Sequence, residues 1–440
     1  MKQTTKSAVC AALLLCLLTG CGARQTTASQ ISEQHASSKQ PPVSAARSEK
    51  ASSSAVLQAV SSEASAASSQ TEEQTELDNM TLSQKVGQLF FLCFRKDTDG
   101  TNLFTYNDTV KNTIQAIQPG GIVLFGENIH TTAQVRRLIQ NMQQDCKTPP
   151  FVGIDQEGGT VQRVTETELI PATVVPSMWR VGQTGSTALA KQVGGVLASE
   201  LSVFGFNLDF APDCDVFSNL NNTVIGTRAF SSDPQQAAVF STAVSAGIRG
   251  QGVIPVCKHF PGHGDTEADT HEGYAVVNKT LEQLQKTELV PFEAQIKAGA
   301  EMIMAAHISL PKINGDNTPA SMSKKVLQGL LREELGFSGV IITDALNMGA
   351  VADNYTSGEA AVRAVQAGAD MLLMPEDPQA AYNAVRKAVQ DGTIPQSRIE
   401  ESVKRILALK KKYKLFSKRE LGDESLLGCE EHQQVVAQIG

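Results

Sequence analysis

The segment Val340-Ile341-Ile342-Thr343-Asp344 combines a run of mostly β-branched apolar residues with a carboxylate at its end. Short apolar runs of this kind are typical of strands that are buried on both faces of a parallel sheet. Similar runs recur along the chain. The other predicted strands are residues 89–94, 121–125, 151–155, 207–211, 254–258, 302–307 and 371–374.

Stretches with helical periodicity separate these strands and follow the last one. They cover residues 131–144, 188–204, 234–250, 281–298, 324–335, 359–367, 378–390 and 397–413. This alternation of strands and helices over about 340 residues predicts an α/β fold of the (β/α)8 TIM barrel type. An open doubly wound sheet is the alternative, but no Gly-x-Gly-x-x-Gly motif follows the first strand.

Charged or imidazole side chains end several of the predicted strands. Because the active sites of TIM barrels lie where strands end and βα loops begin, we expect these side chains to form a polar ring at one mouth of the barrel. Each of them alone could be a satisfied buried group or a loop cap. The residues are Asp155, Asp209, Lys258, His259, His307 and Asp344.

The N-terminal part of the chain differs in kind from the rest, because no Phe, Tyr or Trp occurs before Phe90. Lys2 and Lys6 precede an apolar run over residues 8–18, which is too short to span a bilayer and suits a secretory signal peptide. This run ends in Leu-Thr-Gly-Cys, which resembles the lipobox of bacterial lipoproteins and implies lipidation of Cys21. An ordinary secretory signal with an incidental cysteine is the alternative.

Four segments are therefore expected. Residues 1–20 form the signal peptide, and residues 21–76, which are rich in Ser, Ala and Gln, form a disordered linker. Residues 77–418 form a single catalytic domain, and residues 419–440 are a C-terminal tail. The chain has 46 acidic and 38 basic residues and a net charge of -8, which argues against nucleic acid as a partner.

The loop after the fifth predicted strand carries the densest group of reactive side chains. Residues 258–266 read Lys-His-Phe-Pro-Gly-His-Gly-Asp-Thr. His259 and His263 have the spacing of a zinc-ligand pair on a helix, but Pro261 and Gly262 exclude a helix at this place. We therefore expect a loop that reaches over the pocket and no metal site.

This loop, together with Asp269-Thr270-His271, resembles the signature of the β-N-acetylglucosaminidases of glycoside hydrolase family 3. The resemblance runs from about residue 78 to residue 413. Further segments that carry it are residues 153–159 with Arg163, 207–212, 224–230, 306–307 and 343–348. Three residues depart from the family pattern: Thr270 stands where the family has Ser, and Tyr274-Ala275 stands where it has Leu-Pro. The loss of the proline loosens the end of the loop.

The resemblance implies a role for each matching residue. Asp344 matches the nucleophile, which forms a covalent glycosyl-enzyme in this family. His271, paired with Asp269, matches the general acid/base. The residues that match the family's sugar-binding groups are Asp155, Arg163, Arg228, Lys258 and His259. No cofactor is implied.

The expected protein is a retaining β-N-acetylhexosaminidase that acts on N-acetylglucosamine-containing muropeptides or oligosaccharides, with peptidoglycan fragments as the implied source. Export and lipidation would place it on the outer face of the bacterial cytoplasmic membrane. Three alternatives stay open at this point. They are an N-acetylglucosaminide phosphorylase, a β-glucosidase or β-xylosidase of the same family, and an inactive sugar-binding lipoprotein.

Overall fold

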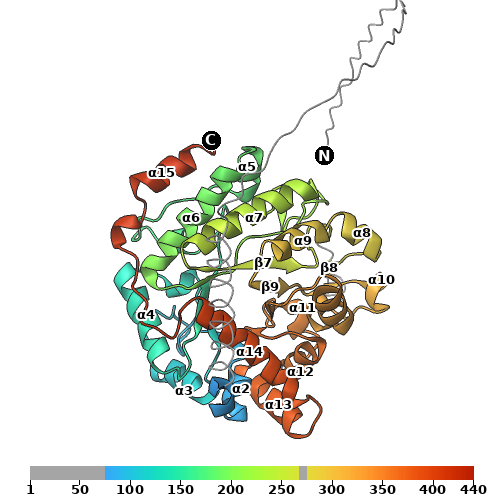
Figure 1. Ribbon diagram of the computed structural model, residues 1–440. Coiled ribbons are helices and arrows are strands. Elements are labelled where there is room, and N and C mark those ends of the chain that lie inside the picture. Colours follow the sequence, from blue (N-terminus) through green and yellow to red (C-terminus); the bar gives the residue numbers. More distant parts are fainter. Residues whose placement is uncertain (1–74, 267–274) are drawn as a thin grey trace, which may run out of the picture. The chain divides into compact units, whose positions relative to one another are not determined.

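The computed structural model describes residues 75–266 and 275–440. Eight parallel strands lie in the order β11-β9-β7-β6-β3-β2-β1-β12, and a parallel bridge between Ile342 and Met371 joins the two ends of this order. The predicted (β/α)8 barrel is therefore confirmed, and helices surround it (Figure 1). The strands are β1 (Phe90–Cys93), β2 (Gly121–Val123), β3 (Phe151–Ile154), β6 (Leu208–Asp209), β7 (Ile254–Phe260), β9 (Met302–Ala305), β11 (Val340–Thr343) and β12 (Leu372–Leu373).

The longer helices begin at residues that favour helix starts. Side chains of Asn107, Thr131, Ser186, Asp233 and Asp377 each accept a hydrogen bond from a backbone N–H of the first turn. These helices, with those between and after them, are α3 (Asp108–Ile117), α4 (Thr132–Gln144), α6 (Thr187–Phe204), α7 (Pro234–Gly250), α9 (Leu289–Lys297), the π-helix η5 (Lys325–Glu334), α12 (Ser357–Ala367), α13 (Pro378–Gln390) and α14 (Gln396–Lys412).

Shorter elements lie in the connections. The helices are α2 (Leu82–Gly87), α5 (Met178–Gln183), α8 (Leu281–Lys286), α10 (Pro311–Asn314), α11 (Gly349–Ala352) and α15 (Glu430–Ala437), and the 3-10 turns are η1 (Gly126–Asn128), η2 (Val164–Glu166), η3 (Gly226–Arg228), η4 (Ala320–Met322) and η6 (Glu424–Leu426). The short strands are β4 (Gln156–Gly158), β5 (Val161–Gln162), β8 (Ala275–Val276) and β10 (Ile308–Ser309).

The prediction of one continuous helix over residues 281–298 is wrong. Residues 281–298 form two helices, α8 and α9, with a break at Thr287. Pro291 explains the break, because its ring clashes with the carbonyl of the residue four positions earlier, which is Thr287, and it offers no N–H to that carbonyl.

The inside of the barrel is filled by one cluster of buried apolar side chains that draws on all eight strands. Side chains alternate between the two faces of a strand, so the members of this cluster mark the inward positions. Ile406 and Leu409 of α14 pack onto the same cluster at the end of the barrel where the strands begin. The strand residues are Phe91, Val123, Phe151, Leu208, Ile254, Val256, Met302, Met304, Val340, Ile342 and Leu373.

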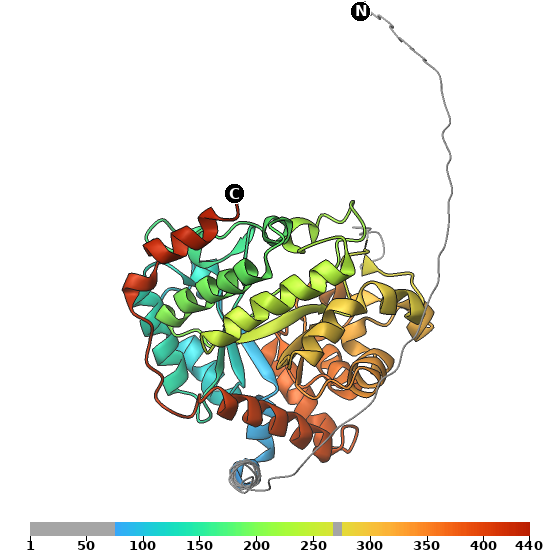
Figure 2. The same ribbon diagram turned by 45° about the horizontal axis from the view of Figure 1, so that its top comes forward.

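The C-terminal tail packs on the barrel through η6 and α15. The carboxylate of Glu200 on α6 accepts hydrogen bonds from the backbone N–H of Gly428, at 3.0 Å, and pairs with His432 Nδ1 at 2.9 Å. Figure 2 shows α15 beside α6 at the edge of the helical layer. None of the described helices is long and apolar enough to cross a membrane.

The expected signal peptide, Cys21 and residues 21–74 of the expected linker lie outside the described residues. Residues 75–79 are helical, and Leu77 is buried. The five cysteines between Cys93 and Cys429 are free thiols.

Candidate active site

Inward positions at the ends of three strands carry the central polar groups. Val256 of β7 and Ile342 of β11 point into the barrel. By alternation Lys258 and Asp344 continue the same inward faces, two residues further along. Asp155 follows β3 directly. The carboxyl ends of the strands therefore bring a lysine and two carboxylates to one mouth of the barrel.

Lys258 is held between two carboxylates. Its Nζ lies 2.6 Å from Asp155 Oδ1 and 2.6 Å from Glu157 Oε1. Glu157 also accepts two hydrogen bonds of 2.8 Å from the guanidinium of Arg228. Burial alone would raise the pKa of Glu157, but Lys258 and Arg228 outweigh burial and hold this pKa below its ordinary value. Burial opposes the charge of Lys258, yet Asp155 and Glu157 raise its pKa, so Lys258 and Glu157 stay ionised.

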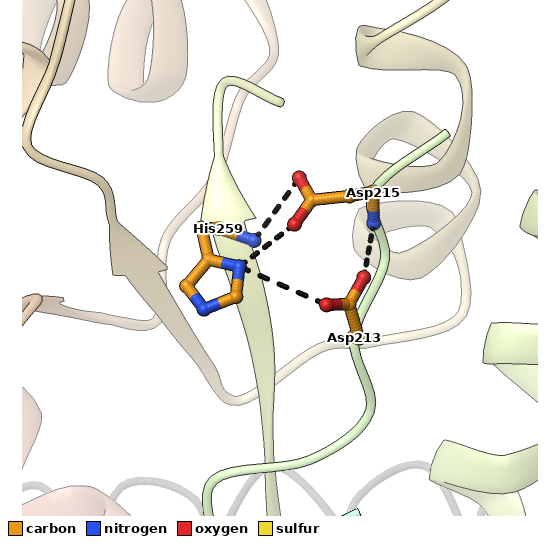
Figure 3. Close-up of side chains that lie close together, drawn as sticks. All are labelled: Asp213, Asp215 and His259. Atoms are coloured by element: carbon orange, nitrogen blue, oxygen red, sulfur yellow. Dashed lines mark hydrogen bonds and ion pairs between the residues drawn. The ribbon is translucent and has the colours of Figure 1, made fainter. Parts of the chain in front are cut away.

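His259 is oriented by Asp215, as Figure 3 shows. Its Nδ1 lies 2.7 Å from Asp215 Oδ2, and the other oxygen of Asp215 accepts the backbone N–H of His263 at 2.6 Å. Burial would lower the pKa of His259, but Asp215 raises it above the ordinary histidine value. The outer nitrogen, Nε2, lies 3.3 Å from Arg228 Nη2. Asp215 therefore fixes the plane of the imidazole ring and favours its protonated form.

The second carboxylate near His259 belongs to Asp213 and differs from Asp215 in charge. Burial and the neighbouring Asp215 raise the pKa of Asp213 to about 7. Its Oδ2 is buried without a hydrogen-bond partner, 3.9 Å from His259 Nδ1 and 3.7 Å from Arg228 Nη2. A carboxyl group in such surroundings shares its site with a proton near neutral pH.

Asp213, Asp215 and His259 also stand close enough together for a metal ion. Their surroundings do not suit one, because the Arg228 cation approaches the same Asp213 oxygen that would bind the ion. His259 Nδ1, the nitrogen that would ligate the ion, already pairs with Asp215 at 2.7 Å. The two carboxylates are therefore better suited to positioning the imidazole of His259 than to binding a metal ion.

Asp344 is held at the end of β11 by the backbone. Its own N–H donates to the Ala305 carbonyl at 2.8 Å, and its Oδ1 accepts the N–H of Ala345 at 2.8 Å. Burial would raise the pKa of Asp344, but the nearby His259 and the Ala345 hydrogen bond lower it below the ordinary value. The site therefore keeps an ionised carboxylate in a partly buried position, which suits a nucleophile.

His307 contacts the backbone of Ala345, which directly follows Asp344. Its Nε2 lies 3.0 Å from the Ala345 carbonyl, and its Nδ1 lies 2.7 Å from the Ser321 hydroxyl. Burial lowers the pKa of His307, in spite of the nearby Asp344 charge. The neutral ring donates one N–H to the Ala345 carbonyl, so His307 holds the backbone that directly follows Asp344.

Glycine is required where the loop after β7 passes the preceding segment. A Cβ at Gly264 would lie 1.7 Å from the Val216 carbonyl oxygen, so any other residue would push the two segments apart. The Asn222 amide also donates to the His263 carbonyl at 2.7 Å. These contacts fix the first half of the loop.

The predicted site residues fall into three groups. Asp155, Arg228, Lys258 and His259 form one network, and Asp344 lies near enough for His259 and Lys258 to lower its pKa. Arg163 instead pairs with Glu166 at 3.2 Å and lies over the ring of Phe125, with its Nε buried and unpartnered. Asp269 and His271 lie outside the described residues.

Reasoning from sequence assigned no role to Glu157, Asp213 and Asp215. Glu157 lies within the recognised segment 153–159 and follows Asp155 at an alternate position, which is a signal for a shared face. Asp213 and Asp215 follow Pro212 in irregular backbone, where no periodicity predicts side-chain direction. Only the three-dimensional structure relates Asp215 to His259.

Comparison with known proteins identifies the family of the chain. Residues 81–409 match the model of the glycosyl hydrolase family 3 N-terminal domain. A protein named beta-hexosaminidase A from Pseudoalteromonas piscicida is 32% identical over 394 residues, which cover 82% of this chain and 66% of that protein. The chain therefore spans about two thirds of the length of this curated relative.

Two solved structures are similar to the barrel. A family 3 β-N-acetylglucosaminidase from Paenibacillus sp. str. FPU-7 is 37% identical, with a TM-score of 0.76, 82% of this chain and 68% of that chain covered. A β-glucoside phosphorylase is 27% identical, with a TM-score of 0.76, 84% of this chain and 66% of that chain covered. The chain belongs to glycosyl hydrolase family 3 and is a glycoside hydrolase related to the β-hexosaminidases.

Proposed function

We propose that this glycoside hydrolase is a retaining β-N-acetylhexosaminidase that removes non-reducing terminal N-acetylglucosamine, with peptidoglycan fragments as its substrates. The observation that carries the proposal is the ionised Asp344 carboxylate, whose pKa the nearby His259 and Lys258 lower. The names of the similar β-hexosaminidase and β-N-acetylglucosaminidase support the choice of sugar.

The proposed reaction proceeds in two displacements. Asp344 attacks the anomeric carbon while a proton donor protonates the departing oxygen, and a covalent glycosyl-enzyme forms. Water, deprotonated by the same group, then attacks the anomeric carbon and releases Asp344. The resemblance assigns the proton transfers to His271, oriented by Asp269.

The described network supplies donors and acceptors for sugar hydroxyls. Asp155 is less buried than Glu157, so its free oxygen can accept a hydroxyl proton while Lys258 donates to a neighbouring oxygen. Arg228, whose Nη2 lies 3.3 Å from the outer nitrogen of His259, adds a further donor on the same side. Because Glu157 and Asp215 are fully committed to Arg228, Lys258 and His259, these donors are fixed before the sugar arrives.

The central test is the Asp344→Ala variant, assayed on an aryl N-acetyl-β-glucosaminide. We expect turnover to fall by about 10³-fold or more, because the covalent intermediate needs this carboxylate. Asp353→Ala, at an exposed carboxylate shortly after the same strand, is the matched control and should keep full activity. Wild-type protein that binds the sugar without turnover would identify the inactive sugar-binding alternative.

A second test addresses the proton donor. The His271→Ala variant should lose much more activity on a natural disaccharide than on an aryl glycoside, because a good leaving group needs little protonation. Equal losses of kcat/KM on both substrates would contradict the assignment of His271.

The similarity to a β-glucoside phosphorylase supports a second candidate. In a phosphorylase, phosphate replaces water in the second displacement, and the product is a sugar 1-phosphate. Assay of the wild-type protein with and without inorganic phosphate separates the two reactions. Release of free N-acetylglucosamine at an unchanged rate supports the hydrolase, whereas sugar 1-phosphate as the main product identifies the phosphorylase.

Export and lipid anchoring at Cys21 belong to the same proposal. The anchor would hold the enzyme on the outer face of the cytoplasmic membrane, where peptidoglycan fragments occur. After the membrane fraction is washed at high salt, which removes electrostatic contacts, a Cys21→Ser variant expressed in a bacterium should be absent from it, whereas the wild-type protein should stay in it. Equal distribution of both proteins would argue for an ordinary secretory signal.

A further inference from the structure

The end of the barrel opposite the proposed active site carries two adjoining hollows. We call this end, where the strands begin, the basal face. One hollow, of about 460 Å³, is lined by residues that directly precede β3 and β6, namely Pro150 and Asn207. The other is lined by Gly252, which lies two residues before the start of β7. Both are also lined by Ser417, Lys418 and Arg419, from the segment 413–421 that follows α14.

The basal hollows are basic although the whole chain has a net charge of -8. Among the described residues, no carboxylate lines either hollow, while Lys147, Lys414, Lys418 and Arg419 do. Three further basic residues also line the hollows, but each pairs with a carboxylate. Arg249 and Lys412 pair with Glu301, and Arg136 pairs with Glu424. The remaining excess of positive charge predicts an anionic ligand.

Arg419 is the clearest sign of a missing partner. Its Nη2 donates to the Gly252 carbonyl at 2.9 Å, but its Nη1 is buried without any partner in the described part of the chain. Burial lowers the pKa of Arg419, and no carboxylate opposes this effect. A phosphate group would supply the acceptor that this guanidinium lacks.

Apolar side chains alternate with these cations. Phe416 and Leu421 are 38% and 48% exposed, and both lie in the segment 413–421 together with Lys414, Lys418 and Arg419. Glu420 is the single acidic residue of this segment. Lysine and arginine beside exposed aromatic and leucine side chains are the combination that binds the interface of an anionic membrane.

The path of the chain favours the same partner. Lys85 of α2 pairs with Glu400 of α14 at 2.8 Å, so the described chain enters at the end of the barrel that α14 covers (Figures 1 and 2). The linker that follows Cys21 therefore joins the barrel on the basal side. Asp344, Asp155 and Lys258 lie at the opposite ends of the strands.

We propose that the basal face binds anionic phospholipid headgroups through Arg419, Lys418 and Lys414, with Phe416 and Leu421 inserted at the interface. This contact turns the barrel so that its catalytic mouth faces away from the membrane. A lipid-anchored enzyme would then present its site to material in the cell wall instead of to the bilayer.

The test uses the full chain with Cys21→Ser, so that no acyl chain contributes, and measures co-sedimentation with vesicles. We expect binding to phosphatidylcholine vesicles that contain about one third phosphatidylglycerol, release at high salt, and little binding to phosphatidylcholine alone. Equal binding to both vesicle types, or none to either, would overturn the proposal.

Variants locate the contact. Lys414→Asn with Lys418→Gln should weaken vesicle binding by about 25-fold, from about fivefold for each charge removed. Asn suits position 414, because Lys414 has a φ of 56°. The matched control, Lys312→Gln with Lys324→Gln, removes two exposed charges between β9 and η5 near the catalytic mouth and should bind like the parent protein. Equal weakening in both pairs would show a general charge effect and overturn the proposed site.

One more variant separates a membrane from a soluble anionic polymer. Phe416→Ser should weaken binding to the anionic vesicles but leave any binding to soluble polyphosphate unchanged, because only a bilayer accepts the phenyl ring. Vesicle binding that is unaffected by Phe416→Ser, or fully displaced by millimolar glycerol phosphate, would reject the membrane surface. All these variants should keep their turnover of a soluble aryl glycoside.

Discussion

His259 has two carboxylates within reach, and they make different contributions at the scale of the single residue. Asp215 is ionised and pairs with Nδ1 at 2.7 Å, while Asp213 has a pKa of about 7. Asp215→Asn removes the charge that raises the pKa of His259 and can present its N–H₂ to the ring. We expect kcat/KM to fall by about 10–100-fold, the value of one charge-assisted hydrogen bond.

The matched variant is Asp213→Asn. Because Asp213 is half protonated near pH 7, the amide resembles its neutral form, and below that pH we expect less than about a threefold change. An NMR titration of the His259 ring supplies a second readout, since its pKa should fall in Asp215→Asn. Equal losses in both variants, without a change in this pKa, would mean that Asp215 has only a structural role.

Lys410 of α14 gives the chain a second residue-scale property, a pH-dependent stability. It is fully buried, donates to Gln88 Oε1 at 2.7 Å and lies over the Phe151 ring. Burial lowers its pKa to about 7. Between pH 7 and the ordinary lysine range, the unfolded chain binds a proton that the folded chain does not, so stability rises with pH by about 1.4 kcal/mol per unit at most.

Lys410→Met should remove this dependence. The difference in unfolding free energy between Lys410→Met and wild type should favour the variant most strongly below pH 7 and shrink as the pH rises toward 10. Denaturant unfolding across this range measures it. Lys404→Met, at an exposed position of the same helix, is the control and should leave the slope unchanged. A slope shared by all three proteins would assign it to other groups.

At the scale of elements, the sequence predicts what periodicity and chain stiffness decide. All eight strands occur within their predicted ranges or overlap them, because a buried parallel strand must be apolar along its whole length. Pro291 indicates the helix break at Thr287. The apolar periodicity of residues 281–298 continues across this break, however, and predicts a single helix. The contacts of Asp215 and Arg419 depend on loop paths, which no local pattern encodes.

The C-terminal elements offer a sharp test of packing. Gly428 has a φ of 60°, and a Cβ there would lie 2.1 Å from the Pro171 carbonyl oxygen. Gly428→Ala should therefore push η6 and α15 away and weaken the hydrogen bonds of Glu200, with a loss of about 3 kcal/mol. Thermal unfolding measures the loss.

Gly428→Ala combines two destabilising effects, the strain of a positive φ and the clash of the new Cβ with Pro171. Gly315→Ala separates them. Gly315 has a φ of 83°, but a Cβ there meets nothing within 4 Å. Its replacement carries the backbone cost alone, about 1 kcal/mol. Equal losses at the two glycines would mean that α15 does not need close contact with the segment around Pro171.

At the scale of the whole molecule, the two ends of the barrel carry different groups of charged side chains. The mouth gathers ionised carboxylates around Lys258 and Arg228, with Asp344 left free of any salt bridge in the described residues. The basal end gathers cations with few partners. The same strands join both ends, so the barrel is rigid. Binding of the basal face to a membrane would therefore set the direction in which the catalytic mouth faces.

The site itself depends on closure of the whole barrel, because Asp155 and Asp344 are far apart in the sequence. A ligand that bridges these groups binds only the folded chain and so stabilises all of it. N-acetylglucosamine at about 100 times its Kd should add about 2.7 kcal/mol, which corresponds to a Tm increase of about 2–5 °C for a domain of this size.

Asp155→Asn should abolish most of this Tm increase, because the amide cannot both accept a sugar hydroxyl and pair with Lys258. Asp353→Asn should keep it. Asp344→Asn should keep it as well, since the nucleophile contributes to the transition state more than to ground-state binding. A Tm increase that survives in Asp155→Asn would place the sugar elsewhere on the barrel, while a loss in Asp344→Asn alone would mean that this carboxylate holds the sugar instead of attacking it.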